Sequence, residues 1–265
     1  MPVLLFKKVA LFLLFPFAFL FSAPIGNPAQ PFLQKTGIVD ERPSWWSFRI
    51  GYLGDYTYNQ AFRDEFRIQG VKTTITEMQL WTQSGVITFN IRNRIDLYAI
   101  LGSSRMQLDK EMTTQRNFAW GLGGKVILFH SGRIRGGVDV KYFHTNQKPL
   151  YFISEHLPYN VVSPFLLRYH EIQFAFGLSY RSTYFSPFVN ATYLLAKIEP
   201  DPLIALVRLP MMDLEVDVSS KSVIGIKRWG MAAGVTLIDS RKATLAAEWR
   251  GFNQNSVSVT GELRF

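Results

Sequence analysis

The sequence predicts an all-β fold: an antiparallel transmembrane β-barrel of about 12 strands, with 10–14 compatible with the pattern. Three observations predict it: an apolar N-terminal leader, apolar residues at every second position, and a final strand that ends on an aromatic residue. After the leader no apolar run approaches the roughly 18 residues of a membrane helix. Only helices and closed barrels satisfy every backbone polar group in lipid, so this chain is expected to cross a membrane with strands.

Residues 1–22 have the pattern of a secretory signal peptide. Lys7 and Lys8 precede an apolar run over residues 9–21, which is too short to span a bilayer. Cleavage after Ser22 is expected to leave residues 23–44 as a periplasmic segment and residues 45–265 as the barrel. Loss of the two lysines lowers the formal charge from +9 to +7, an excess that favours anionic solutes or lipid heads, or only keeps the loops soluble.

The composition indicates one strand-rich exported domain. Hydrophobic residues make up 48% of the chain and aromatic residues 15%, and they alternate rather than recur at helical spacing. Cysteine is absent, so disulfides and thiolate metal sites are excluded. Closure of a backbone ladder is the expected source of stability instead.

Ten strands follow from the alternation. The first covers residues 48–58, and four hairpins turn near residues 92–94, 130–132, 182–183 and 239–242. The segment 203–218 alternates on both sides of Pro210, and an extra hairpin there makes twelve strands. Short turns on one side and longer charged connections over 60–72, 109–116 and 147–169 on the other are typical of outer-membrane barrels, with the turns in the periplasm.

The last ten residues predict the strand that closes the ring. Val257, Val259, Gly261, Leu263 and Phe265 share one face, opposite Ser256, Ser258, Thr260, Glu262 and Arg264. We expect this strand to pair with residues 48–58. A C-terminal aromatic residue, here Phe265, is the expected signal for the barrel assembly machinery.

A soluble barrel and a membrane barrel share this period and differ in which face meets the solvent. The leader, the Trp and Tyr residues at strand ends and a polar face that mixes charges with Gly and Ala favour the membrane barrel. The charges on that face are then the candidates to line a pore, where fixed charge sets ion preference; paired charges that plug a narrow barrel are the alternative. These candidates are Arg49, Asp55, Arg92, Asp96, Lys125, Asp139, Lys141, Glu171, Arg181, Glu248, Arg250, Glu262 and Arg264.

Other motifs carry little chemistry. The glycine-rich residues 121–125 lack the spacing of a phosphate loop and sit within a strand. His170 and Glu171 are adjacent in a strand, so their side chains point to opposite faces and cannot form a catalytic pair. Asn190–Ala191–Thr192 matches a glycosylation acceptor but lies in a spanning strand. We expect no enzyme, no metal site, no cofactor and no nucleic-acid partner.

Several stretches in order along the chain resemble the chlamydial major outer membrane porin family. They are residues 24–31, 48–56, 90–97, 118–125, 169–181, 234–239 and 263–265. The resemblance implies a barrel in the bacterial outer membrane, assembly as a homotrimer, and passive passage of small solutes. This chain departs from the family in having shorter loops and no cysteine, so it is not expected to share the cross-linking role of its members.

The leading hypothesis is therefore a porin-like channel for passive diffusion of small hydrophilic solutes, leaning toward anions. A structural or adhesive barrel without an open pore is the alternative, and an outer-membrane barrel hydrolase is a weaker one. Outer-membrane lipid, the barrel assembly machinery and small solutes are the expected partners.

Overall fold

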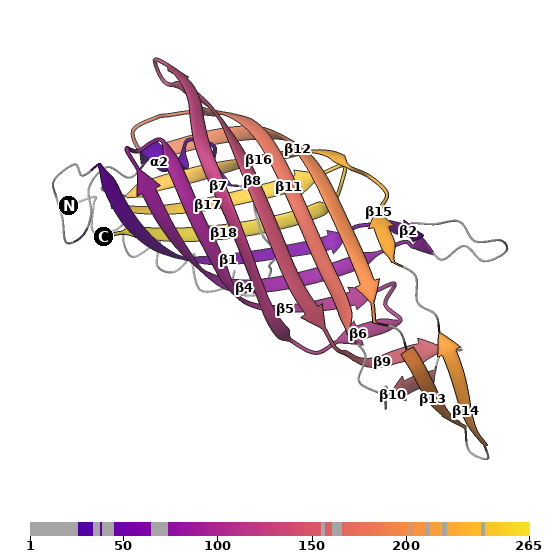
Figure 1. The fold of residues 1–265 in the computed structure, drawn as a ribbon. Helices are drawn as coiled ribbons and strands as arrows, with labels where there is room; N and C mark the ends of the chain where they lie inside the picture. Colours follow the sequence, from indigo (N-terminus) through magenta and orange to yellow (C-terminus); the bar gives the residue numbers. More distant parts are fainter. Residues whose placement is uncertain are drawn as a thin grey trace, which may run out of the picture.

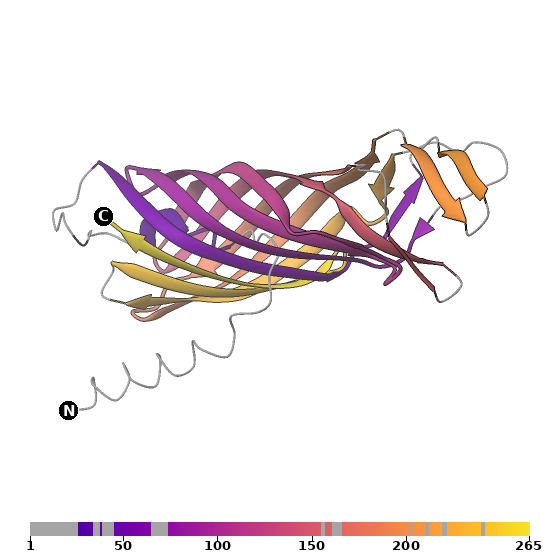
Figure 2. The same ribbon diagram turned by 90° about the horizontal axis from the view of Figure 1, so that it is seen from below.

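The computed structural model describes residues 26–33, 38, 45–64, 74–154, 157–160, 166–201, 203–209, 212–218, 222–239 and 242–265. Ten long strands form a closed antiparallel ring (Figures 1 and 2). In ring order they are β1 (Trp46–Asn59), β4 (Met78–Ile91), β5 (Ile95–Leu108), β7 (Asn117–Ser131), β8 (Ile134–Gln147), β11 (Leu167–Tyr180), β12 (Phe185–Pro200), β16 (Trp229–Asp239), β17 (Ala243–Gly251) and β18 (Asn255–Arg264).

The first and last strands close the ring. Arg49 lies opposite Arg264, and the pairing continues to Thr57 opposite Ser256, while β1 pairs with β4 along its other edge. The expected pairing of residues 48–58 with the final strand is confirmed. Because closure leaves no unpaired edge in the ring, the backbone N–H and C=O groups of the wall are satisfied within it.

The two ends of the barrel differ. The β4–β5 turn at residues 92–94, the β7–β8 turn at residues 132–133 and the start of β1 lie at one end, the turn end, and longer connections lie at the other, the loop end (Figure 1). Arg92 and Asn93 have φ values of 51° and 52°, the left-handed conformation that reverses the chain in tight hairpin turns. Arg92 is exposed in this turn and does not point into the ring, so it differs from the other candidates for the lumen.

Short strands extend the structure at the loop end. They are β2 (Phe62–Asp64), β3 (Thr74–Ile75), β6 (Met112–Thr114), β9 (Pro149–Ser154), β10 (Leu157–Asn160) and β15 (Val223–Gly225). The ambiguous segment forms a hairpin, β13 (Leu203–Leu209) with β14 (Met212–Val218), which is a separate two-stranded sheet and does not join the ring. The ring therefore has ten strands rather than the twelve of our best estimate, within the expected range.

The strands expose their apolar face and bury their polar face. Ile50, Leu97, Phe174 and Leu263 are 43–53% exposed, whereas Arg49, Asp96, Gln173 and Arg264 on the opposite parity are at most 2% exposed. A water-soluble barrel would do the reverse. The outward face has the composition that contact with lipid requires.

Inside the ring, an apolar cluster packs across the lumen toward the loop end. Its members come from β1, β4, β5, β7, β8, β11 and β12, among them Leu53, Leu80, Ile100, Phe143 and Leu194. Phe62 of β2 and Val223 of β15 join it from the short strands.

Within the described part of the chain, no helix is long and apolar enough to cross a membrane. A single short helix, α2 (Gln30–Leu33), precedes β1 in the described chain.

Candidate functional site: the lumen of the ring

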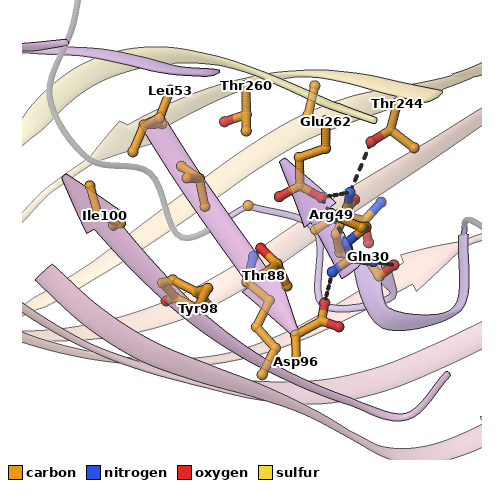
Figure 3. A pocket seen from close by; sticks show the side chains of 15 residues that line it. Gln30, Arg49, Leu53, Thr88, Asp96, Tyr98, Ile100, Thr244, Thr260 and Glu262 are labelled. Carbon is orange, nitrogen blue, oxygen red and sulfur yellow. Dashed lines mark hydrogen bonds and ion pairs between the residues drawn. The ribbon is translucent and has the colours of Figure 1, made fainter. Parts of the chain in front are cut away.

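The inward-facing charges form ion pairs with one another. Arg49 contacts Asp96 and also lies 3.2 Å from Glu262, from Nε to Oε2 (Figure 3). Arg250 contacts Asp55 and lies 3.4 Å from Glu248, from Nε to Oε1. Three of these four contacts join side chains from different strands that are neighbours or near neighbours in the ring, whereas Arg250 and Glu248 lie two residues apart in β17.

Two lysine pairs lie along the neighbouring strands β7, β8 and β11. Lys125 Nζ is 3.6 Å from Asp139 Oδ2, and Lys141 Nζ is 3.2 Å from Glu171 Oε1. Asp139 also accepts a hydrogen bond of 2.7 Å from the Tyr98 hydroxyl. A lumen open to water would expose such groups, yet Arg49, Asp55, Asp96, Lys141 and Arg250 are each at most 2% exposed. In this structure the charges face one another.

The N-terminal segment 26–33 lies inside the ring at the turn end. Its Asn27 side-chain amide donates to Thr236 Oγ1 at 3.0 Å and to the Ser186 carbonyl at 3.2 Å. The Gln30 amide donates to Thr244 Oγ1 and to Glu262 Oε2, both at 2.9 Å. We call this segment the plug. The plug belongs to the segment 23–44 that we expected in the periplasm, and these hydrogen bonds hold its residues 26–33 in the lumen.

The lumen wall holds the plug through its backbone as well. Arg49 donates to the Gln30 carbonyl at 3.2 Å, Asn90 to the Pro31 carbonyl at 3.1 Å, and Asn190 to the Gly26 carbonyl at 3.1 Å. The backbone N–H of Gly26 donates to Glu248 at 2.6 Å. The Phe32 ring lies 4.1 Å from the Arg135 guanidinium and 5.0 Å from that of Arg181, which is cation–π geometry.

A cavity of about 50 Å³ separates the plug from the wall. Asn27 and Gln30 bound it on the plug side, and Arg49, Thr88 and Thr260 on the wall side (Figure 3). Its volume holds a few water molecules, since one needs roughly 10–15 Å³ of this measure. Its lining is mixed, because Arg49, Thr260 and Glu262 are polar whereas Leu53, Val86 and Ile100 are apolar.

Most of the candidate residues come together in this lumen. Eleven of them, all except Arg92 and Arg181, face inward as partners in the ion pairs above or, for Arg264, as a donor to Asn93 Oδ1 at 2.9 Å. Arg181 follows β11 and lies beside Phe32 at the turn end. The sequence reasoning missed Asn27, Gln30 and Tyr98, because an amide or a phenol carries no signal until its partner across the ring is known.

Two histidines of the described chain, His144 and His170, lie outside the lumen. His144 and His170 lie on the outward parity of β8 and β11, with their Nδ1 atoms 3.2 Å apart and the Tyr142 hydroxyl 2.9 Å from His170. Trp120 packs against Tyr142 and His144. Within the described residues no group of three or more His, Asp or Glu is placed to hold a metal ion.

Gly123 lies where the wall is too close for a side chain. A Cβ at this position would be 2.3 Å from Tyr98 Cζ, so Gly123→Ala must displace Tyr98 from Asp139. We expect this variant to lose about 1–3 kcal/mol of unfolding free energy, measured by urea titration in detergent. Gly124→Ala is the matched control, because its Cβ would meet nothing closer than 3.5 Å; equal losses for both would contradict the packing.

Comparisons with known proteins relate the whole chain to one group. The major outer membrane porin of Chlamydia trachomatis serovar B is 21% identical over 373 aligned positions, covering 92% of this chain and 95% of the porin. The serovar D porin is 20% identical with the same coverage. No protein-family model matches. The chain is a distant, full-length homologue of these porins and an outer-membrane β-barrel.

Among solved structures, the outer membrane protease OmpT from Escherichia coli aligns with 83% of this chain and 96% of its own, at 12% identity and a TM-score of 0.40. The beta domain of the Bordetella autotransporter BrkA aligns with 84% and 99%, at 9% identity and a TM-score of 0.46.

Proposed function

We propose that this outer-membrane barrel is a narrow porin-type channel, without enzymatic activity, for passive diffusion of small hydrophilic solutes. One observation carries the proposal: the turn end of the lumen is occupied by the plug, which is not a strand of the wall and is held there by hydrogen bonds. Such contacts contribute about 0.5–1.5 kcal/mol each, and because the ring is closed by strand pairing alone, release of the plug would break none of that pairing. The relationship to porins supports the same function.

The charge at the turn end supports a preference for anions. Arg135, Arg181 and Arg264 all lie at this mouth, while the charges deeper in the lumen belong to both signs. An excess of fixed positive charge raises the local concentration of anions. The mouth, rather than the centre of the lumen, is therefore proposed to set the selectivity.

Purified protein in planar bilayers tests the channel. We expect small conductance steps and, in a salt gradient, a reversal potential displaced toward the anion. Replacing Arg135 and Arg181 together by Gln should remove most of that displacement, because both guanidinium groups lie at one mouth. A reversal potential displaced toward the cation in the unmodified protein would refute the anion preference.

The second candidate is a structural or adhesive barrel without an open pore. The burial of Arg49 and Arg250, at 1% exposure each, favours it, and so do the short strands that extend the loop end. A complete lack of conductance, both with and without the plug, would select this candidate over the channel. Cleavage of a signal peptide, recognition of Phe265 by the assembly machinery and a homotrimer stay predictions from the sequence.

A further inference from the structure

Four hydroxyl side chains surround Asp55 on the inside of the ring. Thr82 of β4 lies opposite Asp55 on one side, and Ser258 of β18 lies opposite it on the other. Ser84 lies opposite Leu53, and Ser256 lies opposite Thr57. Opposite residues of antiparallel strands have Cα atoms about 4.5–5.5 Å apart, so Thr82, Ser84, Ser256 and Ser258 form one group, the hydroxyl cluster.

The hydroxyl cluster is buried and has no hydrogen-bond partner among the described residues. Its four side chains are at most 3% exposed, and each of the four oxygens lacks a partner, as does Asp55 Oδ1. A buried polar atom without a partner costs about 1–3 kcal/mol. Native proteins satisfy such atoms with ordered water when the protein supplies no partner, and five such atoms on three neighbouring strands indicate a hydrated region.

The hydroxyl cluster adjoins the cavity beside the plug. On β18, Thr260 lies next to the cluster on its turn-end side, and on β4 Val86 and Thr88 do the same. All three residues line the cavity. The inward face of β18 is thus polar from Glu262 beside the plug, through Thr260 and Ser258, up to Ser256 near the loop end. On the neighbouring strands, Leu53 of β1 and Val86 of β4 belong to the apolar cluster, so the polar path follows β18 between the cavity and the hydroxyl cluster.

We propose that the hydroxyl cluster and the cavity form one hydrated track, and that this track is the route of water and small neutral polyols through the ring. Hydroxyl groups both donate and accept hydrogen bonds, as the hydroxyls of such solutes do. The charge of Asp55 is compensated by Arg250, so the track favours neutral solutes over ions along this stretch. The proposal rests on the proposed channel and names its path.

Single cysteines test the track, because the natural chain contains none. Ser84→Cys and Ser258→Cys are placed in the hydroxyl cluster, and Ala119→Cys and Leu194→Cys are the controls in the apolar cluster. With the folded protein in lipid vesicles, methyl methanethiosulfonate should modify the two cluster cysteines at least tenfold faster than the controls. Equal rates at all positions would overturn the track, and two positions on different strands keep the test valid if one variant does not fold.

Vesicle swelling in glycerol then tests the route. Modification of Ser258→Cys should slow swelling severalfold, whereas modification reagent applied to Leu194→Cys should leave it unchanged. Swelling that persists at full rate after complete modification of Ser258→Cys places the route elsewhere and overturns this proposal while the channel stands. Vesicles that fail to swell with the unmodified protein overturn the proposed function itself.

Discussion

A disulfide between Asn27→Cys and Thr236→Cys is expected to silence the channel under oxidising conditions, and reduction should restore conductance. The Asn27 amide lies 3.0 Å from Thr236 Oγ1, so the two side chains meet directly between the plug and β16. A covalent bond there prevents the plug from leaving the lumen. The measurement is planar-bilayer conductance of one preparation before and after addition of dithiothreitol.

A weakened plug should have the opposite effect. Asn27→Ala with Gln30→Ala removes the donors to Ser186, Thr236, Thr244 and Glu262. If the lost contacts destabilise the seated plug by about 1.4 kcal/mol, the ratio of open to closed channels rises about tenfold. The single variant Asn27→Cys, with no partner cysteine, is the control for the disulfide. If the double cysteine variant had the same conductance before and after reduction, the plug would not be a gate.

The faces of the strands could be predicted from the sequence because the side-chain period of a strand is two. In the last strand, Ser256 and Ser258 are buried and Leu263 and Phe265 are exposed, as the alternation required. The sequence also predicted that the apolar face meets lipid and the polar face lies inside the ring, because the leader and the aromatic strand ends indicated a membrane barrel rather than a soluble one. These properties are local, and a single strand displays them.

The number of strands in the ring depends on pairing that a local pattern does not contain. The segment 203–218 has the alternation of a hairpin and forms one, yet it pairs only with itself among the described strands. Arg92 shows the same limit on a smaller scale: its parity in the sequence placed it inside, but the left-handed turn begins at that residue. The alternation of polar and apolar residues continues to Arg92, whereas strand β4 ends at Ile91.

The plug could not be predicted, because it has no periodic signal and its contacts are remote. Gly26 bonds to Glu248, and Gln30 to Glu262, across more than 200 residues of sequence. The pairing of the lumen charges is remote in the same way: parity placed Arg49 and Glu262 on the inward face, and only the register across the closing strands brought them together. The sequence thus predicted which residues enter the lumen but not whether they line it or fill it.

Arg250→Met is expected to destabilise the barrel by about 3 kcal/mol, at the lower end of the range for a buried charge that loses its partner. The variant leaves Asp55 and Glu248 without the guanidinium that they share. Asp55 is fully buried and its Oδ1 atom has no partner among the described residues, so water in the proposed track would reduce the cost. Urea unfolding in detergent measures the change.

Two comparisons separate the charge from the packing. Asp55→Leu combined with Arg250→Met should recover part of the loss, because only one of the two carboxylates, Glu248, then remains beside the missing arginine. Arg168→Met breaks the exposed pair with Asp201, whose atoms are 2.6 Å apart and whose arginine side chain is 49% exposed, and should cost no more than about 1 kcal/mol. If Arg250→Met cost as little as Arg168→Met, Asp55 would be solvated on both oxygens. The pair would then line a water-filled lumen instead of closing it, and the plug would be the main barrier to solutes.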